Sequence, residues 1–195
     1  MLWTPEEGFF LRSRHIERLL DSAEYFGFPV SEPAIEQSLD RLTTTLDGPH
    51  RIRLLLDHEG KTEITAAPLF LDSKPVRVAL ADAPVNSSDK FLFHKTTRRE
   101  VYDKARALHP DCDDVLLYNE QGELTEFTIG NLVVELDGML VTPPVACGLL
   151  PGTFRAKLLE TGRITEHILP LHRLRECKRI YRINSVRNWE IVILL

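Results

Sequence analysis

Residues 91–99 read FLFHKTTRR, and this stretch decides how the rest of the chain is interpreted. Its apolar start predicts a strand that delivers Lys95 to its end, directly before a helix N-terminus with Arg98 and Arg99. Apolar surroundings and neighbouring cations both lower the pKa of an amine, and a lysine that forms an imine needs a lowered pKa. A solvated basic cluster that opens a helix is the alternative, and the spacing by itself favours that alternative.

A second stretch, GELTEFTIGN at residues 122–131, predicts a strand over residues 124–129. On this strand Leu124, Glu126 and Thr128 share one face. A carboxylate in the middle of a strand near the core is costly unless a cation or a protonated ring pairs with it. The alternative is a half-exposed strand on which Glu126 faces solvent.

A third stretch, CGLLPGTFR at residues 147–155, leads through two glycines and a proline into a predicted helix. The backbone N–H groups at such a helix start, together with the Thr153 hydroxyl, suit a phosphate group. The alternative is a tight connection followed by an ordinary capped helix.

The remaining pattern predicts two mixed α/β domains. Residues 1–82 form the smaller one, residues 83–90 are a polar linker, and residues 91–195 form the larger one. The expected helices cover residues 12–26, 33–46, 97–108, 152–160 and 171–180, and the expected strands cover residues 51–57, 62–69, 76–80, 114–118, 124–129, 131–135, 165–169 and 188–195. The basic stretch from His172 to Arg187 is interpreted for most of its members as a solvated helix face.

Composition and charge exclude several classes of protein. A net charge of −5 over 195 residues argues against general nucleic-acid binding, which needs a basic surface. No apolar run approaches the ~20 residues of a membrane span, and the N-terminus lacks the pattern of a signal peptide. Three widely spaced cysteines (Cys112, Cys147 and Cys177) predict neither a disulfide framework nor a metal site, and they favour a reducing cytoplasm. The motifs of Rossmann dehydrogenases, P-loop NTPases, zincins and α/β-hydrolases are missing.

Taken in order, Lys95, TExxxxN at residues 125–131 and GxxxGTxR at residues 148–155 resemble the class IV (fold type IV) pyridoxal-phosphate enzymes. These include branched-chain and D-amino-acid aminotransferases and aminodeoxychorismate lyase. The stretch RHIERLLDSA at residues 14–23 resembles the N-terminal helix of that family. Within the family, HKTTRR, CGLLPGTFR and NSVR at residues 184–187 are most similar to the lyase domain fused to aminodeoxychorismate synthase component I.

The resemblance implies the roles of the residues nearest the chemistry. Lys95 would form the imine with pyridoxal 5'-phosphate and shuttle the proton. Glu126 would pair with the protonated pyridine nitrogen. Arg98 or Arg99 would lie near the ring hydroxyl or a substrate carboxylate, which leaves two assignments open.

The resemblance also implies the residues around the cofactor phosphate. Arg18, which lies off the apolar stripe of its helix and would otherwise be an ordinary surface arginine, would contact the phosphate. Thr153 and Phe154 would do so from the helix start, and Ser185 and Val186 would do so from a late turn.

The family implies a fold of two α/β subdomains with the cofactor between them, and a homodimer in which the partner subunit helps to build the site. The most favoured activity converts 4-amino-4-deoxychorismate to 4-aminobenzoate and pyruvate on the folate route. The alternatives are a class IV amino-acid aminotransferase of the branched-chain or D-amino-acid type, and a catalytically weak cofactor-binding domain that acts with a synthase partner. The chain begins within a predicted strand and is short beside stand-alone family members, so a lyase domain of the fused type is expected.

Overall fold

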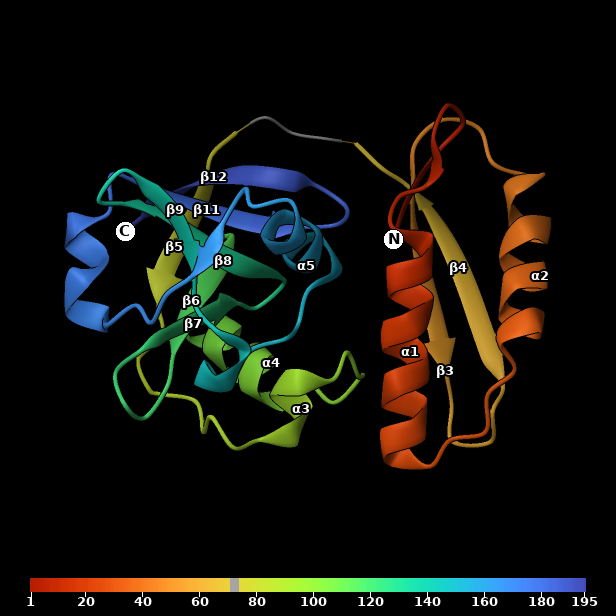
Figure 1. Cartoon of the computed structure of the whole chain (residues 1–195), viewed down its shortest axis with the longest axis horizontal. Coiled ribbons are helices and arrows are strands. Elements are labelled where there is room, and N and C mark those ends of the chain that lie inside the picture. Colours follow the sequence, from red (N-terminus) through yellow and green to blue (C-terminus); the bar gives the residue numbers. More distant parts are fainter. Residues whose placement is uncertain (71–73) are drawn as a thin grey trace. The chain divides into compact units, whose positions relative to one another are not determined.

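A computed structural model describes residues 1–70 and 74–195. The chain forms two compact units, Met1–Asp72 and Ser73–Leu195. Both units mix helices with sheets (Figure 1). Among the described residues, no helix has both the length and the hydropathy to cross a bilayer.

The first unit is a four-stranded antiparallel sheet with two helices. The strand order is β2-β1-β3-β4. Its core joins Ile16 of the first helix and Ile35 and Leu39 of the second helix to Trp3 and Ile52 of the sheet. The elements are β1 (Leu2–Thr4), β2 (Gly8–Phe9), α1 (Arg12–Phe26), α2 (Glu32–Thr43), β3 (His50–Leu56) and β4 (Thr62–Pro68).

The second unit is built on an eight-stranded sheet in the order β10-β9-β8-β11-β12-β5-β6-β7. Its strands are β5 (Val76–Leu80), β6 (Asp114–Tyr118), β7 (Leu124–Phe127), β8 (Gly130–Leu136), β9 (Met139–Thr142), β10 (Thr165–Glu166), β11 (Arg179–Asn184) and β12 (Asn188–Leu194). Because β8 also pairs with β7, the strands from β8 round to β7 close into a barrel-like ring. An apolar core that includes Val78, Leu116, Phe127 and Leu132 fills this unit.

Helical segments connect these strands. They are α3 (Lys90–Phe93), α4 (Glu100–Leu108), η1 (Val145–Cys147), α5 (Thr153–Glu160) and η2 (Leu171–Glu176). A smaller cluster, which includes Leu92, Tyr102, Val115 and Leu117, packs α3 and α4 against β6. This packing holds the segment that contains Lys95 close to the sheet.

The predicted domain boundary at residue 82 is wrong. Strand β5 pairs in parallel with both β12 and β6, so it belongs to the second unit. The predicted linker is also bound to that unit, because the Ser87 N–H and hydroxyl both donate to Glu120, at 2.9 and 2.7 Å. A polar composition here marks an ordered surface loop rather than a passage between domains.

Two predicted elements have another conformation. The apolar residues before Lys95 form the helical turn α3 instead of a strand, because the Asp89 carboxylate caps this turn by accepting from the Phe91 N–H at 3.0 Å. The helix predicted over residues 171–180 is a 3₁₀ segment that ends at Glu176, and β11 follows it. Strand β9 was not predicted.

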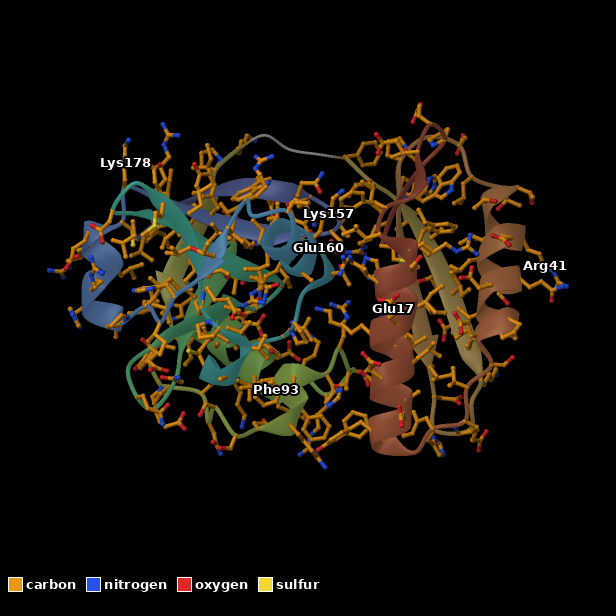
Figure 2. All side chains as sticks on the ribbon, viewed as in Figure 1. Glu17, Arg41, Phe93, Lys157, Glu160 and Lys178 are labelled. Carbon is orange, nitrogen blue, oxygen red and sulfur yellow. The ribbon has the colours of Figure 1, made fainter. Side chains whose placement is uncertain are left out.

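The basic stretch therefore has two kinds of residue. Lys178 remains exposed, as expected, and pairs with Glu135 at 3.2 Å (Figure 2). Arg182, in contrast, is only 5% exposed and lies within β11. The interpretation as a solvated helix face is wrong for this arginine.

Candidate active site

Glu126 lies where the barrel closes, on β7 opposite Asn131 of β8. Its side chain is 4% exposed, so it does not face solvent. Oε1 accepts from the Tyr102 hydroxyl at 2.7 Å and from the Leu150 N–H at 3.1 Å. Oε2 accepts from Asn131 Nδ2 at 3.2 Å. The strand prediction was right about the element, and of its two alternatives the structure selects the buried carboxylate.

Burial raises the pKa of Glu126 from 4.5 to about 7. The hydrogen bond from Tyr102, the positive charge of Lys95, the Leu150 N–H and the charge of Arg99 all lower this pKa, but they do not outweigh burial. A buried carboxyl group that titrates near neutrality is typical of a functional site.

Lys95 follows α3 in the chain and is exposed. Its charge acts on Glu126, so the structure brings together the two groups that the sequence singled out from separate stretches. Of the two groups, the carboxylate is the buried one.

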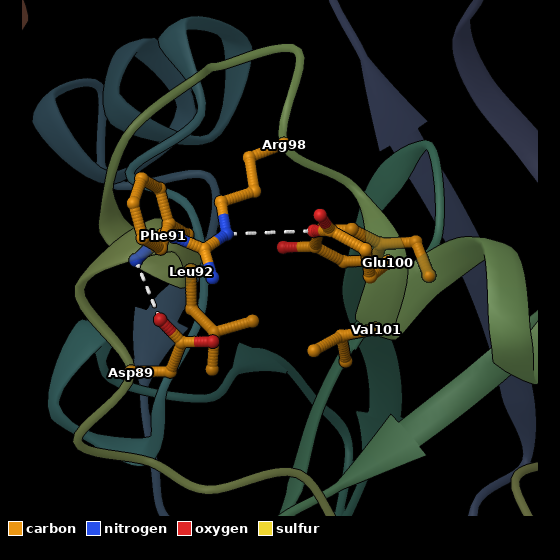
Figure 3. A pocket seen from close by; sticks show the side chains of 7 residues that line it. Asp89, Phe91, Leu92, Arg98, Glu100 and Val101 are labelled. Carbon is orange, nitrogen blue, oxygen red and sulfur yellow. Dashed lines mark hydrogen bonds and ion pairs between the residues drawn. The ribbon is translucent and has the colours of Figure 1, made fainter.

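Arg98 and Arg99 lie in different surroundings. Arg98 is exposed; its guanidinium lies 4.4 Å above the ring of Phe91, and its Nε is 3.6 Å from Glu100 Oε2 (Figure 3). Arg99 Nη2 donates to the Thr128 carbonyl at 2.6 Å. Of the two arginines, Arg99 therefore lies beside the strand that carries Glu126, whereas Arg98 lines a small pocket with Phe91.

The start of α5 is the candidate phosphate contact. Thr153 and Phe154 form its first turn and are both buried, at 5% and 7% exposed. Gly152 occupies the cap position because a side chain cannot fit there: a Cβ atom would lie 1.9 Å from Asn131 Oδ1. Asn131 Nδ2 also donates to the Leu150 carbonyl at 2.8 Å, which ties this helix start to Glu126.

Arg155 has a structural role. Its guanidinium donates to the Pro143 carbonyl at 2.7 Å and pairs with Glu166, which fixes α5 against β9 and β10. The arginine in the GxxxGTxR motif thus stabilises the fold. The N–H groups at the helix N-terminus belong to the residues that precede it.

Ser185 and Val186 form the turn between β11 and β12. Ser185 is 9% exposed, and the Val186 N–H donates to Asn184 Oδ1 at 2.9 Å. Trp189, just after this turn, packs edge to face on Phe154 with ring centroids 6.3 Å apart. The turn is therefore held next to the start of α5.

Arg18 belongs to the first unit and lies half-buried on α1, within the helix that the periodicity predicted. Its assignment to the phosphate stays a prediction. Residues 1–70 and 74–195 contain no group of three His, Cys, Asp or Glu side chains that could hold a metal ion.

Two hydrogen-bonding groups were not assigned a role from the sequence. Tyr102 follows Arg99 by three residues, a spacing that places both on one helix face, and this periodicity was the available signal. The other is a buried network in which Asp114 accepts from Thr128 and from Arg182, and Arg182 also pairs with Glu190. Its members lie far apart in the chain, and no local pattern marks them.

The model of the family "Amino-transferase class IV" matches residues 1–193. The chain belongs to the class IV aminotransferase family. Enzymes of this family depend on pyridoxal 5'-phosphate and share fold type IV, so the fold class expected from the motifs is confirmed.

Class IV relatives carry both kinds of activity in their names. A Schizosaccharomyces pombe protein provisionally named an aminodeoxychorismate lyase is 32% identical over 189 residues, which cover 92% of this chain and 81% of that protein. A Mesorhizobium loti crystal structure provisionally named an amino-acid aminotransferase is 36% identical with a TM-score of 0.94, covering 100% of this chain and 97% of that one. A hypothetical aminotransferase from Mycobacterium tuberculosis in its PLP-bound form shares the fold, with a TM-score of 0.83, 20% identity and coverage of 99% and 78%.

Proposed function

We propose that this chain binds pyridoxal 5'-phosphate and acts as a 4-amino-4-deoxychorismate lyase. The observation that carries the cofactor assignment is the buried Glu126 carboxylate with a pKa of about 7, acted on by the charge of an accessible lysine. Its hydrogen bonds come from a phenol, an amide and a backbone N–H, all of them neutral donors. A cationic ring nitrogen is the kind of group that would complete this site.

The other residues of the site fit the remaining parts of the cofactor. The helix start at Thr153 and Phe154 suits a phosphate, because the N-terminus of a helix presents N–H groups and a partial positive charge. Ser185 and Val186 would contact the same phosphate from the neighbouring turn, and Arg18 would contribute its charge. The position of Arg99 beside the Glu126 strand favours it over Arg98 as the arginine that faces the ring hydroxyl or a substrate carboxylate.

When bound, pyridoxal phosphate supplies an electron-withdrawing ring that accepts the electron pair released at a substrate carbon. Glu126 would hold a proton at the ring nitrogen, which keeps that ring electron-poor. The Lys95 amine would be bonded to the carbonyl carbon of the cofactor until the amine of the substrate takes its place. The freed Lys95 amine would then accept a proton from the carbon that bears the substrate nitrogen and return a proton later in the reaction.

For the lyase, this proton transfer has a definite balance. The substrate loses the proton at the amino-bearing carbon, the C–O bond to the enolpyruvyl group breaks, and the ring becomes aromatic. A proton returns to the departing three-carbon group, which leaves as pyruvate. The products, 4-aminobenzoate and pyruvate, together contain all the atoms of the substrate, so no oxidant or second substrate is needed.

An amino-acid aminotransferase is the second candidate, and the M. loti structure favours it. In that reaction Lys95 would move the proton from the α-carbon of an amino acid to the cofactor, and a keto acid would be required to complete the cycle.

Pyruvate release from 4-amino-4-deoxychorismate, measured without any added keto acid, tests the proposal. We expect steady release by the wild-type protein loaded with pyridoxal phosphate and none by Lys95→Ala. A strict requirement for 2-oxoglutarate or another keto acid would favour the aminotransferase. If wild-type protein and Lys95→Ala both remain colourless after incubation with pyridoxal phosphate, the cofactor assignment is overturned.

A homodimer, a cytoplasmic location and association with an aminodeoxychorismate synthase complete the proposal. They rest on the family resemblance, in which the partner subunit helps to build the site. Sedimentation of the purified protein with and without the cofactor measures the oligomeric state, and a monomer in both conditions would contradict the dimer.

A further inference from the structure

Tyr102 reaches Glu126 from the first turn of α4. The phenol ring is 7% exposed and packs in the cluster with Leu92 and Val115. Its hydroxyl donates to Glu126 Oε1 at 2.7 Å. Burial and the neighbouring Glu126 raise the pKa of Tyr102 far above its usual value, so the phenol keeps its proton and remains a donor.

The two oxygens of Glu126 are bound unequally. Oε1 has two donors, the Tyr102 hydroxyl at 2.7 Å and the Leu150 N–H at 3.1 Å. Oε2 has one long hydrogen bond, from Asn131 at 3.2 Å. A carboxylate oxygen can accept two hydrogen bonds, so Oε2 retains acceptor capacity whereas Oε1 is saturated.

Arg99 packs on the Tyr102 ring. Its guanidinium carbon lies 4.6 Å from the ring centroid, and the same side chain donates to the Thr128 carbonyl. One helix turn therefore holds the strand of Glu126 through Arg99 and the carboxylate itself through Tyr102.

We propose that Tyr102 is a positioning residue that saturates Oε1 of Glu126 and so directs Oε2 toward the ring nitrogen of the cofactor. The inference rests on the proposed function, because it assigns Oε2 to the pyridoxal phosphate ring. Donation by the phenol also favours the ionised carboxylate, so Tyr102 keeps the shared proton on the ring rather than on Glu126.

The groups that act on this carboxylate come from several elements. They are Lys95 after α3, Arg99 just before α4, Tyr102 on α4, Asn131 on β8 and the Leu150 N–H before α5, while Asp89 acts on Tyr102. Only the phenol contact is removed by Tyr102→Phe, which keeps the ring and its packing. Tyr118→Phe is the matched control, because Tyr118 packs against the same cluster and has no described hydrogen bond to Glu126.

The first measurement uses the protein without cofactor. Infrared spectroscopy follows the carboxylic acid C=O band of Glu126 with pH, and the band is assigned by its loss in Glu126→Gln. In Tyr102→Phe we expect the midpoint of the Glu126 titration to rise by about one to two pH units. This is the size expected when one hydrogen bond to a charged group is lost. In Tyr118→Phe we expect the wild-type midpoint.

The second measurement uses protein loaded with pyridoxal phosphate that is ¹⁵N-labelled in the ring. In Tyr102→Phe the ring-nitrogen NMR shift should move toward that of unprotonated pyridine, and in Tyr118→Phe it should not. If the midpoint and the nitrogen shift in Tyr102→Phe both equal those of wild type, the role of Tyr102 is overturned. If wild-type protein takes up no pyridoxal phosphate, the proposed function and the assignment of Oε2 fall together, whatever the infrared midpoint shows.

Discussion

Among its described residues the second unit buries two carboxylates, and they are compensated in different ways. Asp114 is 0% exposed, and its Oδ2 lies 2.7 Å from Arg182, which also pairs with Glu190 at 2.9 Å. Glu126 is 4% exposed; its described hydrogen bonds come from neutral donors, and the charges of Lys95 and Arg99 also act on it. The direct partner of Asp114 is thus a cation, whereas the described hydrogen-bond donors of Glu126 carry no charge.

The largest expected effect on stability comes from removing the cation that pairs with Asp114. Arg182→Met removes the cation beside Asp114 and replaces it with an uncharged, apolar side chain of similar length. Because the buried Asp114 then loses its close cation and keeps only Arg106, at 3.9 Å, we expect the free energy of unfolding to fall by about 3–5 kcal/mol. Urea denaturation measures it, with Arg179→Met, an exposed arginine on the same strand, as the control. Equal stability of the two variants would contradict the structural role of Arg182.

The second largest effect is a pH dependence of stability that comes from the raised pKa of Glu126. Its folded pKa of about 7 lies above the ordinary 4.5, so the folded state binds more protons than the unfolded state between these values. Stability of the cofactor-free protein should therefore decrease as pH rises from 4.5 through 7, by an amount on the order of 3 kcal/mol. Glu126→Gln should lack this component and be the more stable protein at pH 8. Parallel stability curves for the two proteins would contradict the raised pKa.

The turnover of Glu126→Gln tests the role of this carboxylate in catalysis. Glu126→Gln keeps the shape of the side chain but cannot hold a positive ring nitrogen by charge. We expect turnover to fall 10-fold or more, since each ~1.4 kcal/mol of lost transition-state stabilisation is a factor of ten. Steady-state kinetics with saturating cofactor measures this. A folded variant with unchanged turnover would refute the assigned role.

The smallest effect comes from a half-buried arginine with two exposed acidic partners. Arg173 contacts Asp137 at 3.0 Å and Glu176 at 2.8 Å, which resembles the pairing of Arg182, but both carboxylates are open to solvent. Arg173→Gln should lower the free energy of unfolding by less than about 1 kcal/mol, because water and salt screen such pairs. A loss as large as that of Arg182→Met would mean that burial does not explain the difference.

Local sequence patterns predicted the elements that are determined by a single apolar stripe or a single turn. Helix α1 occupies residues 12–26 as expected, since its periodicity and the glycine that ends it are both local signals. The assignment of Lys95 and Glu126 to one site followed from motifs in a fixed order. Neither conclusion required knowledge of a distant contact.

Elements whose partners are distant in the chain could not be predicted in this way. Arg182 resembles a surface residue until Asp114, 68 residues earlier, is placed beside it. Strand β5 was assigned to the first domain because it follows β4 directly, whereas its partners β6 and β12 come later in the chain. Tyr102 lies only seven residues after Lys95, but its hydrogen bond to Glu126 depends on how α4 packs on the barrel.

The contact between Gly152 and Asn131 couples two positions that mutate separately. The space of a methyl group at residue 152 is occupied by the Asn131 amide, whose nitrogen binds both Glu126 and the Leu150 carbonyl. A change as small as Gly152→Ala would therefore displace the amide and disconnect the acid end of the site from its phosphate end. In a library of variants of this protein, substitutions at residue 152 and at residue 131 should therefore be depleted alike, because either one removes the Asn131 amide from its place. Such matched depletion would be a genetic signature of the site that needs no assay of its chemistry.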